Sequence, residues 1–88
     1  MNHSKANKQK ALGMNFSTAS NRLKKQLLFK YVILAGDNIC FVCRQPIEDV
    51  LELSIEHKQP WMARDAFKFW DLNNIAFSHI KCNFRRNR

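Results

Sequence analysis

The sequence predicts a small α+β fold, in which an amphipathic N-terminal helix precedes two short strands and a final helix. Three observations predict it: apolar residues recur at helical spacing up to Gly36, apolar and polar residues then alternate in a short segment, and two Cys/His pairs bracket the second half of the chain. A chain of 88 residues forms one domain. So short a chain buries too little apolar surface to be stable without a staple or a partner.

The N-terminal segment over residues 1–16 holds three lysines among Asn, Ser and Gln, with little apolar periodicity. The sequence therefore predicts a flexible basic arm there. Residues 17–88 are predicted to form the single folded domain.

The first predicted element is a helix over about 18–35, capped by Ser17 or Ser20 and stopped by Gly36. Its second half is apolar on almost every side, which indicates burial in the core or pairing with a second copy of the chain. We favour the core, since a small fold must draw its apolar residues from somewhere.

A short strand is expected next, over residues 39–43, curling into a tight turn that contains two cysteines. Leu51, Leu53 and Ile55 then alternate with polar residues, which is the period of a half-buried strand. This strand is predicted to end at His57.

Residues 58–71 are predicted as a loop, and its two tryptophans, Trp61 and Trp70, are expected to pack in the core. A second strand follows over 74–77. Ser78 is predicted to cap a helix that runs from about 79 to the C-terminus.

The Cys and His spacing predicts a metal site. One Cys-x-x-Cys pair alone occurs in redox motifs as well, but a His-x-x-Cys pair completes a Cys3His set of the kind that zinc prefers. The expected zinc ligands are Cys40, Cys43, His79 and Cys82. Because protein atoms would fill all four positions, this zinc would stabilise the fold and perform no chemistry.

Three cysteines are an odd number, and no leader segment precedes them, so a secreted disulfide framework is not expected and the chain is predicted to be cytoplasmic and reduced. Fifteen Lys and Arg against seven Asp and Glu give a net charge of +8, which favours a polyanionic partner, nucleic acid by default. The apolar stretch over 27–35 is too short to span a bilayer, so no membrane partner is predicted.

In the second half of the chain, Cys, His, Glu and Asn residues follow one another in an order that resembles that of the HNH nucleases, part of the His-Me-finger or ββα-metal superfamily. Its zinc-bearing members commonly read Cys-x-x-Cys, Asp-His, Asn, and a pair ending in Cys-Asn or Cys-His. The resemblance covers roughly residues 36–86 and rests on Cys40, Cys43, Glu56, His57, Asn74, His79, Cys82 and Asn83. It implies a zinc-stabilised ββα-metal fold and a small free-standing endonuclease of the phage or mobile-element type.

The resemblance also implies a role for each matching residue. His57 would be the general base, and its ordinary pKa suits that task near neutral pH. Glu56 and Asn83 would hold a catalytic Mg²⁺ or Mn²⁺ through hard oxygen ligands. Asn74 would bridge the intervening loop and help to orient His57, with Asn73 as an immediate rival. Glu56 stands where the family usually has Asp, and Asn83 where many members have His.

Basic residues near these positions are expected to neutralise DNA phosphates irrespective of sequence. They are Lys58, Arg64, Lys68, Lys81, Arg85, Arg86 and Arg88. Because so small a body offers few groups for reading bases, specificity is expected to need a homodimer or a phage or mobile-element partner protein.

Three alternatives remain open at this stage. A non-catalytic zinc module that binds nucleic acid explains the zinc and the charge equally well, but not the ordered Glu-His, Asn and Cys-Asn residues. A protein-interaction adaptor that binds its partner through the apolar helix is a third class of function, after the nuclease and the zinc module. His79 is also a candidate for the active-site metal in place of the zinc, although its spacing from Cys82 favours the zinc.

Overall fold

The computed structural model describes residues 5–62 and 65–86. Helices α1 (Lys5–Leu12) and α2 (Phe16–Leu34) come first, and the strands β1 (Leu53–His57) and β2 (Ile75–His79) form the only named sheet of these residues. The short helix α3 (Phe67–Trp70) lies between the strands, and α4 (Ile80–Arg86) follows β2 directly. The result is a small α+β molecule, as predicted.

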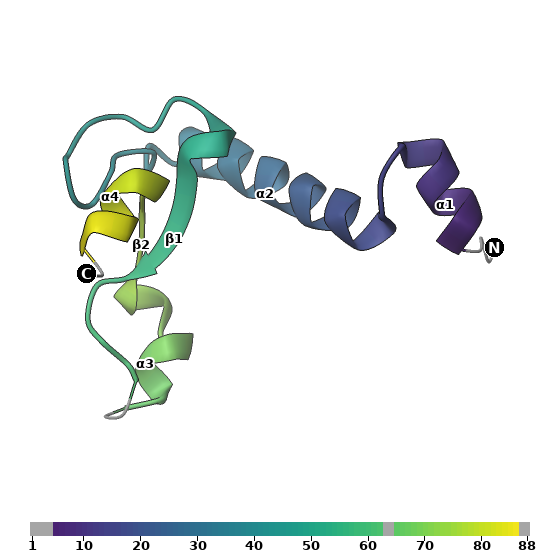
Figure 1. Cartoon of the computed structure of the whole chain (residues 1–88). Helices are drawn as coiled ribbons and strands as arrows, with labels where there is room; N and C mark the ends of the chain where they lie inside the picture. Colours follow the sequence, from purple (N-terminus) through teal and green to yellow (C-terminus); the bar gives the residue numbers. More distant parts are fainter. Residues whose placement is uncertain (1–4, 63–64, 87–88) are drawn as a thin grey trace.

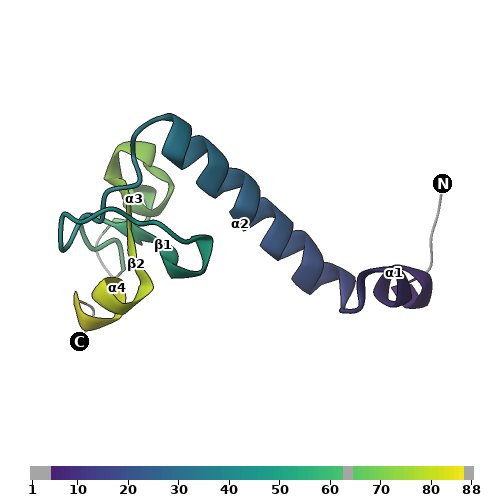
Figure 2. The same cartoon turned by 90° about the horizontal axis from the view of Figure 1, so that it is seen from above.

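The molecule is elongated because α2 projects from the body that the strands and α4 form (Figure 1). Its radius of gyration is 16.0 Å, against about 12 Å for a compact chain of this length. Figure 2 shows α1 at the far end of α2, well away from the two strands. Within the described residues, no helix combines the length and the apolarity that crossing a bilayer requires.

The N-terminal part differs from the prediction. Residues 5–12 form α1, although the sequence indicated no regular element there, because α1 has no apolar face and none of its residues is buried. Helix α2 begins earlier than predicted, and its N-cap is Asn15, whose side chain accepts a hydrogen bond of 2.8 Å from the Ser17 N–H. The predicted stop at Gly36 is confirmed, since Gly36 follows the helix with φ +74°.

The prediction that the second half of α2 is buried in the core is correct for one side of that half and wrong for the rest. Only Val32 is buried, while Leu28 and Phe29 pack partly against the body. Leu27 and Tyr31 are more than half exposed. One side of the C-terminal half of α2 therefore meets the body, and its other sides stay uncovered in the single chain.

The two strands run antiparallel, with Ser54 opposite Ser78 and Glu56 opposite Ala76. The core that they complete is small and consists of Cys40, Ile47, Leu53 and Cys82, with Leu28, Phe29 and Phe77 packed against it. Two of its four buried members are candidate metal ligands. Such a core depends on whatever binds those sulfurs.

Several predicted boundaries shift. The strand predicted over 39–43 is reduced to an isolated bridge between Ile39 and Pro46. Strand β2 extends to His79, so Ser78 lies within the strand and does not cap α4. The alternation predicted for β1 is also wrong at its end, because Glu56 is buried and Ile55 is half exposed.

The loop between the strands contains α3 and a short 3-10 turn, Leu72–Asn74. Trp70 is 76 % exposed, so the prediction that it packs in the core is wrong. Trp61 is partly buried and contacts the Phe69 ring edge-on at 4.8 Å.

Candidate metal centre and the adjoining pocket

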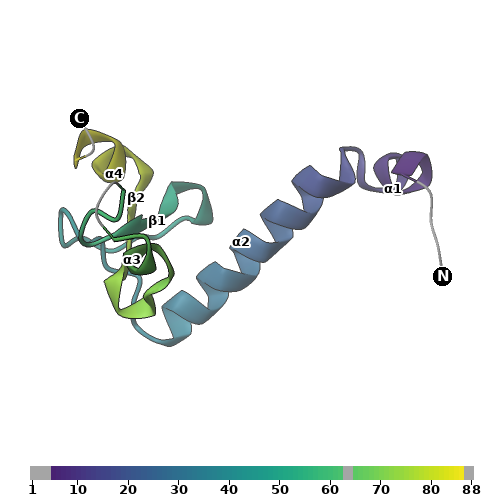
Figure 3. The ribbon, with the colours of Figure 1, turned by 90° about the horizontal axis from the view of Figure 1, so that it is seen from below.

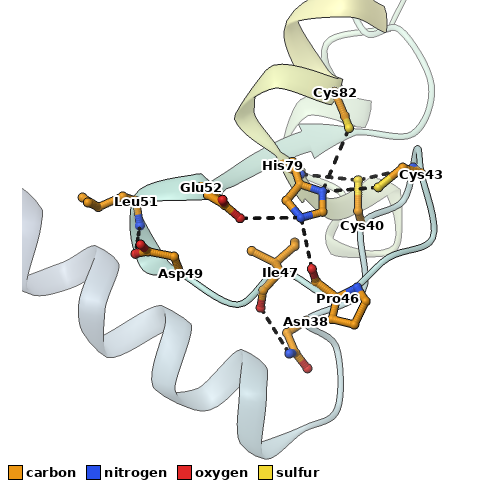
Figure 4. A network of polar contacts seen from close by, with 10 residues as sticks. All are labelled: Asn38, Cys40, Cys43, Pro46, Ile47, Asp49, Leu51, Glu52, His79 and Cys82. Atoms are coloured by element: carbon orange, nitrogen blue, oxygen red, sulfur yellow. Dashed lines mark hydrogen bonds and ion pairs between the residues drawn. The ribbon is translucent and has the colours of Figure 1, made fainter.

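Four side chains from three parts of the chain converge at one end of the hairpin (Figure 4). Cys40 and Cys43 come from the turn after α2, His79 ends β2, and Cys82 lies in the first turn of α4. Their four candidate ligand atoms all lie within 4.8 Å of one another. We call these four residues the Cys3His cluster, and three of them are buried.

The spacing within the Cys3His cluster suits zinc. Bonds of about 2.3 Å to sulfur and 2.1 Å to nitrogen would place neighbouring ligand atoms of a tetrahedral zinc roughly 3.6 to 3.8 Å apart. His79 Nδ1 lies 3.3 Å from the Cys43 sulfur and 4.0 Å from the Cys82 sulfur. The donor set and its geometry therefore fit a zinc ion held by all four residues.

The two innermost thiols of the cluster differ in acidity. Burial opposes ionisation of Cys40, but the N–H groups of Cys43, His79 and Val42 stabilise its thiolate and lower its pKa from 9.0 to about 6. Burial, followed by the neighbouring sulfurs of Cys40 and Cys43, raises the pKa of Cys82 to about 11. Several thiolates at one place repel each other, so a divalent cation is what would let all three ionise together.

His79 is oriented for ligation through Nδ1. Its Nε2 lies 3.1 Å from the Pro46 carbonyl oxygen, which can only accept, so Nε2 donates and Nδ1 keeps its lone pair. A carboxylate oxygen of Glu52 lies 3.7 Å from the same nitrogen. A carbonyl and a carboxylate behind the ring are the usual outer partners of a zinc-bound histidine.

A second site lies beside the cluster. Glu56, His57 and Asn83 line one open pocket with a volume of about 540 Å³, together with Ile55, Gln59, Pro60, Trp61 and Met62. We call it the His57 pocket. On an ideal strand Glu56 and His57 would point to opposite faces, but β1 ends at His57 and both side chains reach the pocket.

The His57 ring is held by the loop that contains α3. Its Nε2 lies 3.0 Å from the carbonyl oxygen of Phe69 and donates to it. The ring stacks on the Phe69 ring at 5.0 Å and lies 5.9 Å from the Trp61 ring. In the neutral imidazole this arrangement makes Nδ1 the nitrogen that can accept a proton.

Two serines connect the carboxylate and the amide of the pocket. Ser78 Oγ donates to Glu56 Oε2 at 2.9 Å, Ser54 Oγ lies 3.2 Å from Ser78 Oγ, and Asn83 Nδ2 donates to Ser54 Oγ at 3.0 Å. With Ser54 as the donor to Ser78, each of the two serine hydroxyls accepts one hydrogen bond and donates one. The sequence reasoning missed both serines, although their positions two residues before Glu56 and five before Asn83 were visible.

Asn74 fastens the loop between the strands. Its Oδ1 accepts from the Gln59 N–H at 2.9 Å, and its Nδ2 donates to the carbonyls of Gln59 and Lys68 at 3.2 and 3.0 Å. The side chain is 7 % exposed, whereas its rival Asn73 is exposed. Since Lys68 adjoins Phe69, the Asn74 bonds hold the segment whose carbonyl meets His57.

The predicted phosphate-binding residues are spread over the body. Lys58 and Lys81 are exposed, and Lys68 donates through Nζ to Gln59 Oε1 at 3.1 Å. Arg64 and Arg88 lie outside the described residues, as do the side chains of Arg85 and Arg86. The structure thus brings the four cluster residues together and, separately, the three pocket residues.

Comparison of the chain with protein-family models gives no match, and neither the curated proteins nor the solved structures give a significant one. Any statement of function therefore rests on the residues and their geometry.

Proposed function

We propose that this protein is a metal-dependent DNA endonuclease of the HNH type, with a structural zinc in the Cys3His cluster and its chemistry in the His57 pocket. The observation that supports it most is the meeting of Glu56, His57 and Asn83 in one open pocket, next to a metal-binding set that needs none of them. A zinc module that only binds nucleic acid has no need of such a pocket.

His57 acts as the general base in this proposal. Its Nε2–H is committed to the Phe69 carbonyl, so Nδ1 takes a proton from the attacking water. The water oxygen then forms the new bond to phosphorus, the bond from phosphorus to the departing sugar oxygen breaks, and that oxygen takes up a proton. The fixed ring keeps the accepting nitrogen in place without further reorganisation.

Glu56 and Asn83 would hold a Mg²⁺ or Mn²⁺ through side-chain oxygens, and both ions accept few protein ligands and several waters. When bound, such an ion supplies positive charge beside the scissile phosphate. The serine chain supports the proposal, since it aims the Asn83 amino group at Ser54 and supplies a hydrogen bond to the buried Glu56 carboxylate.

Plasmid cleavage tests the proposal. Zinc-loaded wild type and His57→Ala are incubated with supercoiled plasmid in Mg²⁺, in Mn²⁺ or without added divalent cation, and nicked and linear products are resolved on a gel. Wild type is expected to cleave only with added cation, and His57→Ala to lose at least about 100-fold of that rate. Omitting the cation is preferable to a chelator, which would also strip the zinc.

Met62→Ala is the matched control, because Met62 lines the same pocket, is 68 % exposed and has no ionisable group. It is expected to keep most of the cleavage activity. Equal cleavage by wild type and His57→Ala would exclude His57 as the base. No cleavage by folded, DNA-binding wild type would favour the non-catalytic module.

A further inference from the structure

The net charge is divided unevenly along the chain. All seven acidic residues lie at position 37 or beyond, where eight Lys and Arg residues nearly balance them. The first 36 residues contain seven Lys and Arg and no acidic residue. Those seven residues all belong to α1 and α2. The helix pair, and not the body with the His57 pocket, therefore holds almost the whole positive charge of +8.

The two helices are joined by a tight turn of three residues, Gly13, Met14 and Asn15. Gly13 closes α1 through its N–H to the Gln9 carbonyl at 2.8 Å and adopts φ +70°, a conformation that favours glycine. Asn15 then caps α2. Figure 3 shows α1 turned out of the line of α2. A short helix, a three-residue turn with glycine and a second helix at an angle follow one another in the order of a helix-turn-helix.

Helix α1 meets α2 at Phe16. Lys8 Nζ lies 4.3 Å from the centre of the Phe16 ring, and Ala11 and Leu12 line a hollow with that ring. Leu23 and Leu27 lie on the same side of α2 as Phe16, seven and eleven residues further along. The apolar side of α2 therefore begins at Phe16, where α1 contacts it.

The other side of the first turns of α2 is polar and basic. Ser17, Thr18, Asn21, Arg22, Lys24 and Lys25 share it, and all but Lys25 are exposed. Leu28 and Val32 continue this side toward the C-terminus, where they pack on the body. The polar side of α2 and the body therefore lie on the same side of the helix.

A concave surface leads from this helix face toward the His57 pocket. Lys24, Lys25 and Leu28 of α2 line a hollow of about 380 Å³ with Leu53 and Ile55 of β1. Ile55 also lines the His57 pocket, where Glu56 and His57 follow it. A long polyanion on the polar face of α2 would thus run along the hollow to the pocket.

We propose that α1 and α2 form a helix-turn-helix that reads double-stranded DNA, with the polar face of the first half of α2 in the major groove. A helix about 10–12 Å across fits a major groove about 12 Å wide. Asn21 and Arg22 have the side chains that pair with adenine and guanine edges, while Lys24 and Lys25 on the same face hold phosphates. In such motifs the start of the second helix reads the bases and the first helix crosses the backbone.

This reading function does not rest on cleavage, since a protein that only binds DNA would use the helices in the same way. Binding is therefore measured with the zinc-loaded full chain in the His57→Ala background and without Mg²⁺ or Mn²⁺. A library of duplexes with a randomised centre is selected for binding, and fluorescence anisotropy then gives the Kd for enriched and unrelated duplexes at a fixed salt concentration of about 150 mM.

Selection is expected to enrich a short sequence. Arg22→Ala and Asn21→Ala are expected to weaken binding to the enriched duplex roughly 5- to 150-fold, and much less to an unrelated duplex. Two controls lie off this polar face: Lys30→Ala, on the apolar side of α2, removes the same charge as Arg22→Ala, and Gln26→Ala, at the border between the two sides, removes an amide. Each control is expected to change the Kd for the enriched duplex by no more than about twofold, since neither side chain lies on the proposed base-reading face. All four changes put a good helix former into a helix, so circular dichroism should show α2 intact.

Equal losses for Arg22→Ala and Lys30→Ala would overturn the proposal and leave only a diffuse charge effect. So would a selection that enriches nothing, or equal competition by double-stranded RNA, whose major groove is too narrow for a helix. Wild-type affinity in all four variants, together with a dimer that Leu23→Glu dissociates, would overturn it in favour of pairing with a second copy of the chain.

Discussion

The Cys3His cluster and the His57 pocket both draw a residue from α4 and differ in almost every physical property. Cys82 and Asn83 are neighbours on α4, yet Cys82 is buried in the cluster while Asn83 lines the open pocket. The cluster has soft sulfur donors, and the pocket has the oxygens of Glu56 and Asn83. Soft donors that fill four positions suit a structural zinc, whereas sparse oxygens suit an ion that keeps its waters.

Zinc in the cluster would hold in place the helix that contributes Asn83 to the pocket, where a second metal would act. Cys40 and Cys82 make up half of the buried core cluster, so zinc bound to them would be a main link between the turn after α2 and α4. Glu56, His57 and Asn83 are not members of that core cluster. Damage to the cluster should therefore cost the fold and everything that depends on it, while damage to the pocket should cost activity alone.

The largest effect is expected for Cys82→Ser. Zinc bound by a complete set of ligands supplies about 10–16 kcal/mol to small zinc domains, which matches or exceeds the whole stability of most domains, about 5–15 kcal/mol. The variant is expected to lose stoichiometric zinc and its cooperative thermal transition, measured by elemental analysis and circular dichroism. Wild type stripped with a chelator should behave in the same way and recover when zinc is added back. A cooperative wild-type transition without zinc would contradict the structural role.

Asn83→Ala changes the neighbouring residue and is expected to separate the two sites. It removes the hydrogen bond to Ser54, which costs about 1 kcal/mol, and should leave the zinc content and the thermal transition nearly unchanged. Cleavage in Mg²⁺ is expected to fall at least about 100-fold, because the variant lacks a proposed ligand of the catalytic cation. The measurement is the nicking rate against Mg²⁺ concentration. An unchanged rate would remove Asn83 from the site, and a collapsed fold would show that the two sites are not separable.

Asn74→Ala is expected to have an intermediate effect. Its three hydrogen bonds join Gln59 to Lys68, and their loss leaves partly buried backbone groups unpaired at a cost of roughly 1–3 kcal/mol. Cleavage should fall as well, since the Phe69 carbonyl that holds His57 belongs to the same segment. The pH profile of cleavage should keep its shape, because Asn74 positions the base and takes no proton itself.

Asn73→Ala is the control for this loop, since Asn73 is adjacent, exposed and equally plausible from the sequence. Chemical denaturation and nicking rates of the two variants give the comparison. Equal losses for both would show that the loop as a whole, and not the Asn74 clamp, orients His57.

The four residues of the Cys3His cluster could be predicted from the sequence, whereas the burial of residues near it, such as Glu56, could not. Ligand spacing is local: Cys40 and Cys43 belong to one tight turn, and His79 and Cys82 are three residues apart at the start of a helix. Glu56 was expected on the solvent side of a half-buried strand, and the structure buries it. The small two-stranded sheet tolerates this buried carboxylate because Ser78, across the hairpin, supplies the hydrogen bond that it needs.

The N-terminal helices were predicted less well than the Cys3His cluster. The spacing of the apolar residues predicted helix α2 correctly. Periodicity does not reveal what covers a helix face, however, and in the single chain only Val32 of α2 is buried. Helix α1 was missed because its residues have no apolar period at all. The uneven division of charge was visible in the sequence and would have pointed to these helices before the structure did.

The smallest effect is expected at Arg44, which tests whether the cluster and the pocket are independent. Arg44 follows Cys43 and adopts φ +66°, a conformation that costs an L-residue about 1–2 kcal/mol and that glycine adopts freely. Arg44→Gly removes that strain. It also adds freedom to the unfolded chain, at about 0.4–1 kcal/mol, and loses the contact of the guanidinium with the Phe41 ring at 5.1 Å, at about 0.5–1 kcal/mol.

Because these contributions nearly cancel, Arg44→Gly is expected to change the free energy of unfolding by less than about 1 kcal/mol. Arg44→Val keeps the strain, worsens it with a β-branched side chain and loses the ring contact, so it should destabilise by more than Arg44→Gly in the same denaturation experiment. Neither change touches the His57 pocket, and the nicking rate of the folded protein should stay at the wild-type value for both. A slower rate in a fully folded, zinc-loaded Arg44→Gly protein would mean that the turn after α2 also shapes the pocket.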